Sequence, residues 1–233
     1  MHEHRDEDLI LFQPLFAIAM SIGFLDLANS VFAAWTKANQ HVLPPSWAVI
    51  VTLLAAGLLL IALRMTWAVA SLSRFIAARR ALGREHCVNA YCVTLWHYPA
   101  LLGQGFAIFV LCRIVGLVTD ADRIGDSIIP FFAVLTGLLF FNAIYLYTVL
   151  PSKAAAAQKD ANGMLCDGGR NIKIGWIINN LAFGIFTAGF LIVSTRAGWS
   201  PSDHYVIGPL VAAMFANSLL DLGFAAPYYV PRA

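Results

Sequence analysis

The sequence has few charged residues for its length. Only 12% of its 233 residues are Asp, Glu, Lys or Arg, whereas 60% are hydrophobic. A soluble domain of this size needs a charged surface, but a lipid bilayer removes that need because its hydrocarbon solvates apolar faces directly. The net charge of +2 is also too small to indicate nucleic-acid binding. The composition therefore predicts an integral membrane protein that has the lipid bilayer, and no nucleic acid, as a partner.

Motifs of familiar enzymes are absent from the sequence. It contains no HExxH, GxSxG, Walker or GxGxxG motif. No lysine lies in a hydrophobic segment, which excludes a retinal pigment, and the histidines are not placed to hold a haem between facing helices. The cysteines are interpreted as ordinary thiols, because the one close spacing, Cys87 to Cys92, is a weak metal signal. We therefore expect no metal, no cofactor and no catalytic residue.

Six hydrophobic segments are long enough to cross a bilayer, which takes about 20 apolar residues for ~30 Å of hydrocarbon. Pro44 and Pro45 precede the second segment and Pro151 closes the fourth. The first segment is too long for the core of a signal peptide, so we interpret it as a retained span. The sequence predicts an all-α fold, a polytopic transmembrane helical bundle in a single domain, 1–233, with spans at about 10–35, 47–69, 92–118, 127–150, 174–195 and 205–228.

Lys and Arg predict the orientation of these spans, because cytoplasmic loops carry an excess of both. The two longer loops hold eight basic residues: Arg74, Arg79, Arg80, Arg84, Lys153, Lys159, Arg170 and Lys173. Each of the other three loops holds one, namely Lys37, Arg123 or Arg196. We therefore expect both long loops and both termini to be cytoplasmic, with the protein in the plasma (inner) membrane.

Two spans present a carboxylate, an amide and a hydroxyl on one helical face. The residues are Asp26, Asn29 and Ser30 in the first span, and Asn217, Ser218 and Asp221 in the sixth. Such faces are costly against lipid, so they must contact neighbouring helices or a wet cavity. Oxygen-rich faces suit Na⁺ or proton binding, and they equally suit plain hydrogen bonding between helices.

Depth along the spans predicts two ion pairs. At 1.5 Å per residue, Asp26 lies roughly 6 Å outward of the midplane and Asp221 about 7 Å inward. Arg113 falls in the outer half with Asp26, and Arg64 in the inner half with Asp221. We expect Asp26 to reach Arg113 inside the bundle, and Asp221 to line a hydrated cavity near Arg64. The alternative is that each arginine extends to its nearer membrane surface.

Weaker polar candidates lie in the third, fourth and fifth spans. Asn142, Asn179 and Asn180 are interpreted as packing hydrogen bonds, and Gln104, between two glycines, as a place of close helix approach.

The first and fourth spans can be aligned, LFAIAMSIGFLD (15–26) over FFAVLTGLLFFN (131–142). Because these spans run in opposite directions, one interpretation is an inverted 3+3 repeat, an arrangement common among transporters. The other two pairs of spans align poorly, so the repeat stays a hypothesis.

Three functional classes fit these features. The first is a small transporter or channel for a cation, a proton or a small solute, in which Asp26, Asn29, Ser30, Arg113, Asp221, Asn217, Ser218 and Arg64 bind the solute or form gates. The second is a non-catalytic membrane subunit or oligomeric scaffold of a larger complex, since polar faces also hold helices together. The third, an intramembrane enzyme, has the least support because no nucleophile or metal set is recognisable. Expected partners are further copies of the chain or other membrane subunits.

Overall fold

The computed structural model describes residues 4–81, 89–118, 124–149, 169–200 and 203–229, and these residues form six α-helices and no strand. The predicted all-α class is confirmed. The helices are α1 (His4–Asn39), α2 (Pro45–Ala81), α3 (Asn89–Val118), α4 (Ile124–Val149), α5 (Gly169–Arg196) and α6 (His204–Tyr229).

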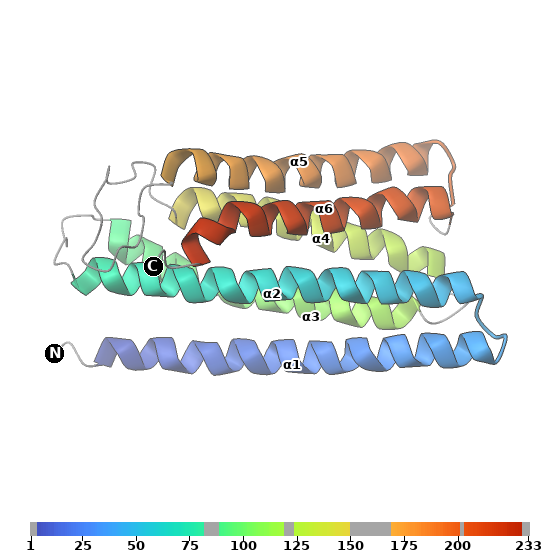
Figure 1. The fold of residues 1–233 in the computed structure, drawn as a ribbon, viewed down its shortest axis with the longest axis horizontal. Coiled ribbons are helices and arrows are strands. Elements are labelled where there is room, and N and C mark those ends of the chain that lie inside the picture. Colours follow the sequence, from blue (N-terminus) through green and yellow to red (C-terminus); the bar gives the residue numbers. More distant parts are fainter. Residues whose placement is uncertain (1–3, 82–88, 119–123, 150–168, 201–202, 230–233) are drawn as a thin grey trace.

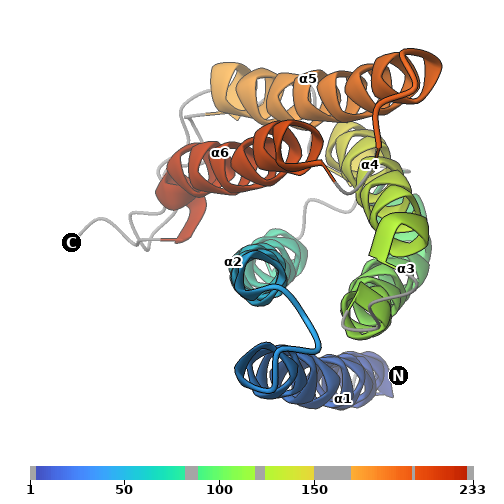
Figure 2. The same cartoon turned by 90° about the vertical axis from the view of Figure 1, so that its right-hand side faces the viewer.

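The helices form a long bundle in which successive helices run in opposite directions (Figure 1). The beginning of α1 and the end of α6 therefore lie at the same end of the bundle. Viewed along the bundle, neighbouring helices pack in the order α1, α2, α6, α5, α4, α3 and back to α1, with a further contact between α2 and α3 (Figure 2). Helix α1 lies at one edge and packs against α2 and α3.

Four helices are long and apolar enough to cross a membrane, which makes the chain compatible with an integral membrane protein. The stretches are Pro45–Thr66, Ser127–Thr148, Ile174–Arg196 and Tyr205–Phe224, and α3 carries a shorter apolar stretch, Leu102–Val118. Aromatic side chains gather where α5 gives way to α6. The rings of Trp199 and Tyr205 meet edge to face at 6.0 Å, as is typical of the aromatic belt of a membrane protein.

The face that α1 turns toward its neighbours is built from residues three or four apart, the spacing of one helical face. Its buried members are Met20, Gly23, Leu27, Ser30, Ala34 and Ala38. Small residues allow close packing here: a Cβ placed on Gly23 would lie 3.6 Å from the Cα of Phe109 in α3.

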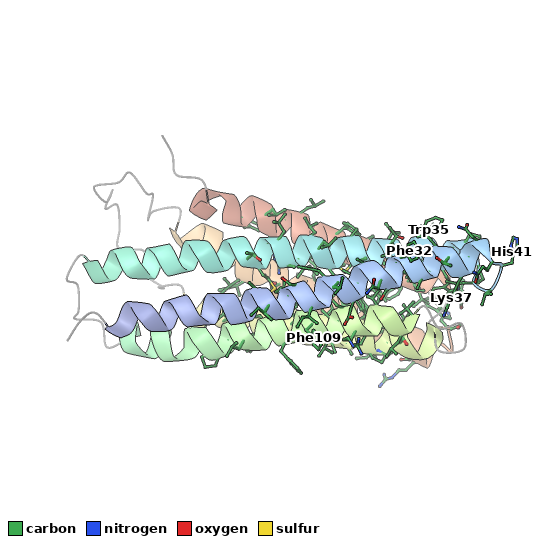
Figure 3. The ribbon with its side chains drawn as sticks, turned by 90° about the horizontal axis from the view of Figure 1, so that it is seen from below. Phe32, Trp35, Lys37, His41 and Phe109 are labelled. Atoms are coloured by element: carbon green, nitrogen blue, oxygen red, sulfur yellow. The ribbon has the colours of Figure 1, made fainter. Side chains whose placement is uncertain are left out.

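Two helices end in the same backbone motif. After α1, the N–H of Val42 donates to the carbonyl of Lys37 at 2.9 Å and His41 adopts a φ of 58° (Figure 3). After α5, the N–H of Trp199 donates to the carbonyl of Ser194 at 3.0 Å and Gly198 adopts a φ of 70°. Both are Schellman-type ends, which need one residue in the left-handed region. Glycine adopts that region without strain, whereas His41 does so at a cost.

The arrangement does not confirm an inverted 3+3 repeat. Helices α1 and α3 pack closely, but their counterparts under the repeat, α4 and α6, form no comparable contact. Each three-helix half therefore has its own pattern of neighbours.

Candidate polar site within the bundle

A cluster of five polar side chains lies buried where α2, α5 and α6 meet. Arg64 comes from α2, Asn179 and Asn180 from α5, and Asn217 and Asp221 from α6. Each is at least 95% buried. Helical spacing places Asn217 and Asp221 on one face of α6, while α6 packs against both α2 and α5. The cluster therefore joins three helices through polar contacts.

The carboxylate of Asp221 accepts hydrogen bonds from three of the other four side chains in the cluster. Arg64 Nη1 donates to its Oδ2, and Asn179 Nδ2 donates to its Oδ1. Asn180 Nδ2 lies 3.3 Å from the same Oδ1. A charge-assisted bond to a guanidinium, supplemented by amide donors, gives both oxygens of this buried carboxylate hydrogen-bond partners.

Asn217 accepts hydrogen bonds from Arg64 and from Asn179. Its Oδ1 accepts from Arg64 Nη1 at 3.2 Å, and its backbone carbonyl accepts from Asn179 Nδ2 at 3.1 Å. Because Arg64 only donates, Asn217 must turn its oxygen toward the guanidinium and its Nδ2 away. The orientation of Asn180 is fixed in the same way, since its Nδ2 donates to the carbonyl of Trp176 at 3.0 Å as well as to Asp221.

These orientations leave one acceptor and one donor unused. Asn180 Oδ1 and Asn217 Nδ2 are buried and have no hydrogen-bond partner among the residues that the structure describes. An unsatisfied buried polar atom costs about 1–3 kcal/mol. A molecule that can both donate and accept, such as water or a small hydroxylated or amide-bearing solute, would satisfy both atoms.

The charges around Asp221 disfavour a metal cation in this conformation. The positive charge of Arg64 balances the carboxylate, and every group that points at it is an N–H donor, whereas Na⁺ and K⁺ need oxygen ligands. Within the described parts of the chain, no group of three or more His, Cys, Asp or Glu could hold a metal ion. Unlike these metal ions, a proton needs no set of oxygen ligands to bind a carboxylate.

Arg64, Asn217 and Asp221 lie near one another, as the sequence predicted, but two expectations about this region fail. The side chain of Asp221 is 1% exposed, so protein groups enclose the carboxylate and it lines no open cavity. The hydroxyl of Ser218 donates to the backbone carbonyl of Met214 at 2.9 Å, one turn back in its own helix, and so takes no part in the cluster. Asn179 and Asn180 take the place expected for it.

The second expected pair also forms, but on a different surface. Arg113 Nη1 donates to Asp26 Oδ2 at 2.9 Å, which bridges α3 and α1. The Arg113 side chain is 64% exposed and that of Asp26 is 29% exposed, so the expectation that this pair lies inside the bundle is wrong. The physical reason is rotation: α1 turns Gly23, Leu27 and Ser30 toward its neighbours, and this leaves Asp26 at the margin of the packed face.

The other members of the first polar face separate. Asn29 is exposed, while Ser30 is buried and donates to the backbone carbonyl of Asp26 at 2.7 Å. A second buried link, which the sequence did not predict as a pair, joins α3 to α4: Gln104 Nε2 donates to Asn142 Oδ1 at 2.9 Å. It carries no charge and fits the expected role of a packing hydrogen bond.

Comparison of the chain with protein-family models, with curated proteins and with solved structures finds no match. Function therefore has to be inferred from the polar groups themselves.

Proposed function

We propose that this protein is a small multi-pass membrane transporter in which the Arg64–Asp221 pair forms an inner gate controlled by a proton. The observation that carries the proposal is the enclosure of an ion pair and three amides at the junction of α2, α5 and α6. Ionisable groups at membrane depth are costly and are found mainly where they serve a pathway or a relay.

Protonation of Asp221 supplies the switch. While Asp221 is ionised, it balances Arg64 and holds α6 against α2. Once it is protonated, Arg64 keeps its charge with no counter-ion, and leaving a buried charge unpaired costs about 3–5 kcal/mol. That penalty favours a conformation in which α2 and α6 separate and Arg64 reaches water or an anionic group of the solute. Proton binding is thereby coupled to opening.

The unused atoms of Asn180 and Asn217 support the same function. A buried donor and a buried acceptor beside an ion pair suit a solute that carries both kinds of group. A water molecule in the same position would extend the hydrogen-bond chain toward Asp221 and provide a route for the proton. A transporter built on this cluster therefore takes a proton together with a small polar solute.

The proposed topology has six spans with both termini in the cytoplasm of a plasma (inner) membrane. Eight basic residues between the second and third and between the fourth and fifth predicted spans, against three in the other segments between spans, support this orientation. Arg64 and Asp221 then lie toward the cytoplasmic side. The proposal does not depend on an inverted repeat.

A structural subunit of a larger membrane complex is the second candidate. It is favoured by the outer pair, because Arg113 and Asp26 expose charge on the surface of the bundle, where another membrane protein could cover it. In such a subunit, the buried cluster would serve assembly alone.

Reconstitution of the purified protein into liposomes separates the two candidates. A pH-sensitive dye in the lumen reports proton movement when amino acids, sugars or organic acids are added outside in turn. We expect one solute class to drive proton entry with the native protein, and Asp221→Asn to abolish it. Asn142→Ala is the matched control, because it removes a buried interhelical hydrogen bond without touching the ion pair.

The subunit function predicts a different outcome. No solute would then move protons, and Asp221→Asn would weaken only the assembly of the protein. That result would contradict the transporter proposal.

A further inference from the structure

The proposed transport through the buried cluster does not explain the Asp26–Arg113 pair, because this pair lies on the outside of the bundle. Arg113 belongs to the apolar stretch Leu102–Val118 of α3, five residues before the helix ends at Val118. At 1.5 Å per residue it lies about 7.5 Å from that end. Other exposed side chains of α1 are apolar, among them Leu25 at 64% and Phe32 at 76%. Figure 3 looks onto the molecule from the side of α1, where Phe32 is labelled.

A charge pair amid such apolar surface is unfavourable in contact with lipid. Hydrocarbon offers no hydrogen bonds to the free N–H groups of a guanidinium or the free lone pairs of a carboxylate. The pair leaves much of Arg113 uncovered, and Asn29, one turn along α1 from Asp26, is exposed as well. A polar partner that covers this surface would remove that cost.

The geometry of the pair indicates what that partner is. Asp26 and Arg113 come from neighbouring helices and touch, so they lie side by side at the same depth. Two copies inserted the same way in a membrane are related by a two-fold axis along the membrane normal. Such an axis exchanges left and right but preserves depth, so the Asp26 of each copy would face the Arg113 of the other. If the two charges instead lay one above the other along a single helix, the same axis would place acid against acid and base against base.

We propose that the face formed by α1 and α3 around Asp26, Asn29 and Arg113 is the interface of a homodimer. Two intermolecular ion pairs then supplement the two intramolecular ones, and the two Asn29 amides lie close to the axis. Buried charged networks of this kind fix the choice and register of the partner.

Other occupants fit this face less well. An anionic lipid headgroup would bind Arg113, but it would place a second negative charge beside Asp26. A different membrane subunit would need an opposite pair at the same depth, whereas a second copy always carries one. This inference does not rest on the proposed transport, because dimerisation is measured without any flux.

Cross-linking in the membrane tests the location of the interface. Asn29→Cys places a thiol near the proposed axis, and Leu219→Cys is the control, since Leu219 is 60% exposed on α6, which packs against neither α1 nor α3. With a short bis-maleimide, we expect a dimer band for the first variant and only the wild-type background for the second. A dimer band for Leu219→Cys, or a cross-link from Asn29→Cys to a different protein, would overturn the proposal.

Charge reversal tests the contact itself. Asp26→Arg makes both positions positive and Arg113→Asp makes both negative, so each variant repels a copy of itself. Alone, each should dimerise about tenfold more weakly than the native chain, the size expected for two interhelical polar contacts. Co-expressed with different tags, the two variants should recover most of the lost association as mixed dimers.

Recovery on mixing cannot come from a folding defect, because misfolded copies would not rescue each other. Failure of the mixed pair to associate better than either variant alone would overturn the proposal. The neutral substitutions Asp26→Asn and Arg113→Gln perturb folding less. Each variant alone should again dimerise more weakly than the native chain, and the mixed pair should again associate better than either variant alone, with smaller differences. A native protein that stays monomeric in lipid nanodiscs at high protein-to-lipid ratio would overturn it directly.

Discussion

Arg64 and Asp221 face each other from α2 and α6, with the guanidinium donating to the carboxylate in a region where both side chains are at least 97% buried. The contact joins residues 157 positions apart in the sequence. It therefore holds α2 against α6 by an ion pair as well as by packing. Separating these two helices requires a new partner for each charge.

The stability of the bundle should depend on both members of this pair. Arg64→Leu or Asp221→Leu should each lower the free energy of unfolding by about 3–5 kcal/mol, because the remaining charge is left buried and unpaired. The double variant should be less damaging than either single one. Unfolding by SDS in mixed micelles, followed by circular dichroism, measures this order, and additive losses would show that the two charges do not interact.

The Gln104–Asn142 hydrogen bond should contribute less. Asn142→Ala should cost about 1–2 kcal/mol, the usual size of an interhelical hydrogen bond in a membrane protein. Gln104→Ala should cost a similar amount, and the two losses should not add, because either change breaks the same bond. The same unfolding assay tests this, and losses that sum fully would mean that the bond contributes nothing.

The helix ends offer a matched pair of substitutions. His41 and Gly198 occupy equivalent left-handed positions in the turns that end α1 and α5. His41→Gly should raise stability by about 1 kcal/mol, since glycine adopts this conformation without strain, and Gly198→Ala should lower it by about the same amount. Thermal unfolding in detergent reports both changes. A loss of stability in His41→Gly would indicate that the imidazole makes a contact worth more than the strain.

The topology can be tested separately from the site. A cysteine introduced at Lys159, in the segment 150–168 that lies outside the described residues, should be shielded from an impermeant thiol reagent in intact cells and react after the membrane is opened. The native Cys166 lies in the same segment, so Cys166→Ser is the background for this experiment. Labelling from outside intact cells would reverse the proposed orientation.

Much of the fold could be predicted from the sequence, because the length of a hydrophobic segment and the depth of a residue within it depend only on position along the chain. Hydrophobic length located all six helices, and the four spans that meet the length and hydropathy requirements correspond to predicted ones. The rise of 1.5 Å per residue predicted depth, and depth alone was sufficient to bring Asp26 to Arg113 and Asp221 to Arg64.

The sequence shows less directly how each helix is rotated about its axis and which residues of other helices it contacts. Asp26 was expected in the interior, but the packed face of α1 is the one that carries Gly23 and Leu27, so the Asp26–Arg113 pair lies on the surface. Asn179 and Asn180 were interpreted as packing residues, because the sequence does not show that their face of α5 meets Asp221 on α6. Two adjacent amides within one turn of a hydrophobic helix were the available signal.

The most direct test of the proposed mechanism is proton movement in liposomes that contain Asp221→Asn, beside the double variant Arg64→Gln with Asp221→Asn. The single change keeps the shape of the carboxyl group but removes its charge and its titration, and the double change also removes the unpaired charge of Arg64. We predict that solute-driven proton entry is lost in both variants, while the double variant recovers the stability that the single variant lacks. Native rates of proton entry in Asp221→Asn would contradict the account, because the proposed gate would then operate without its proton site.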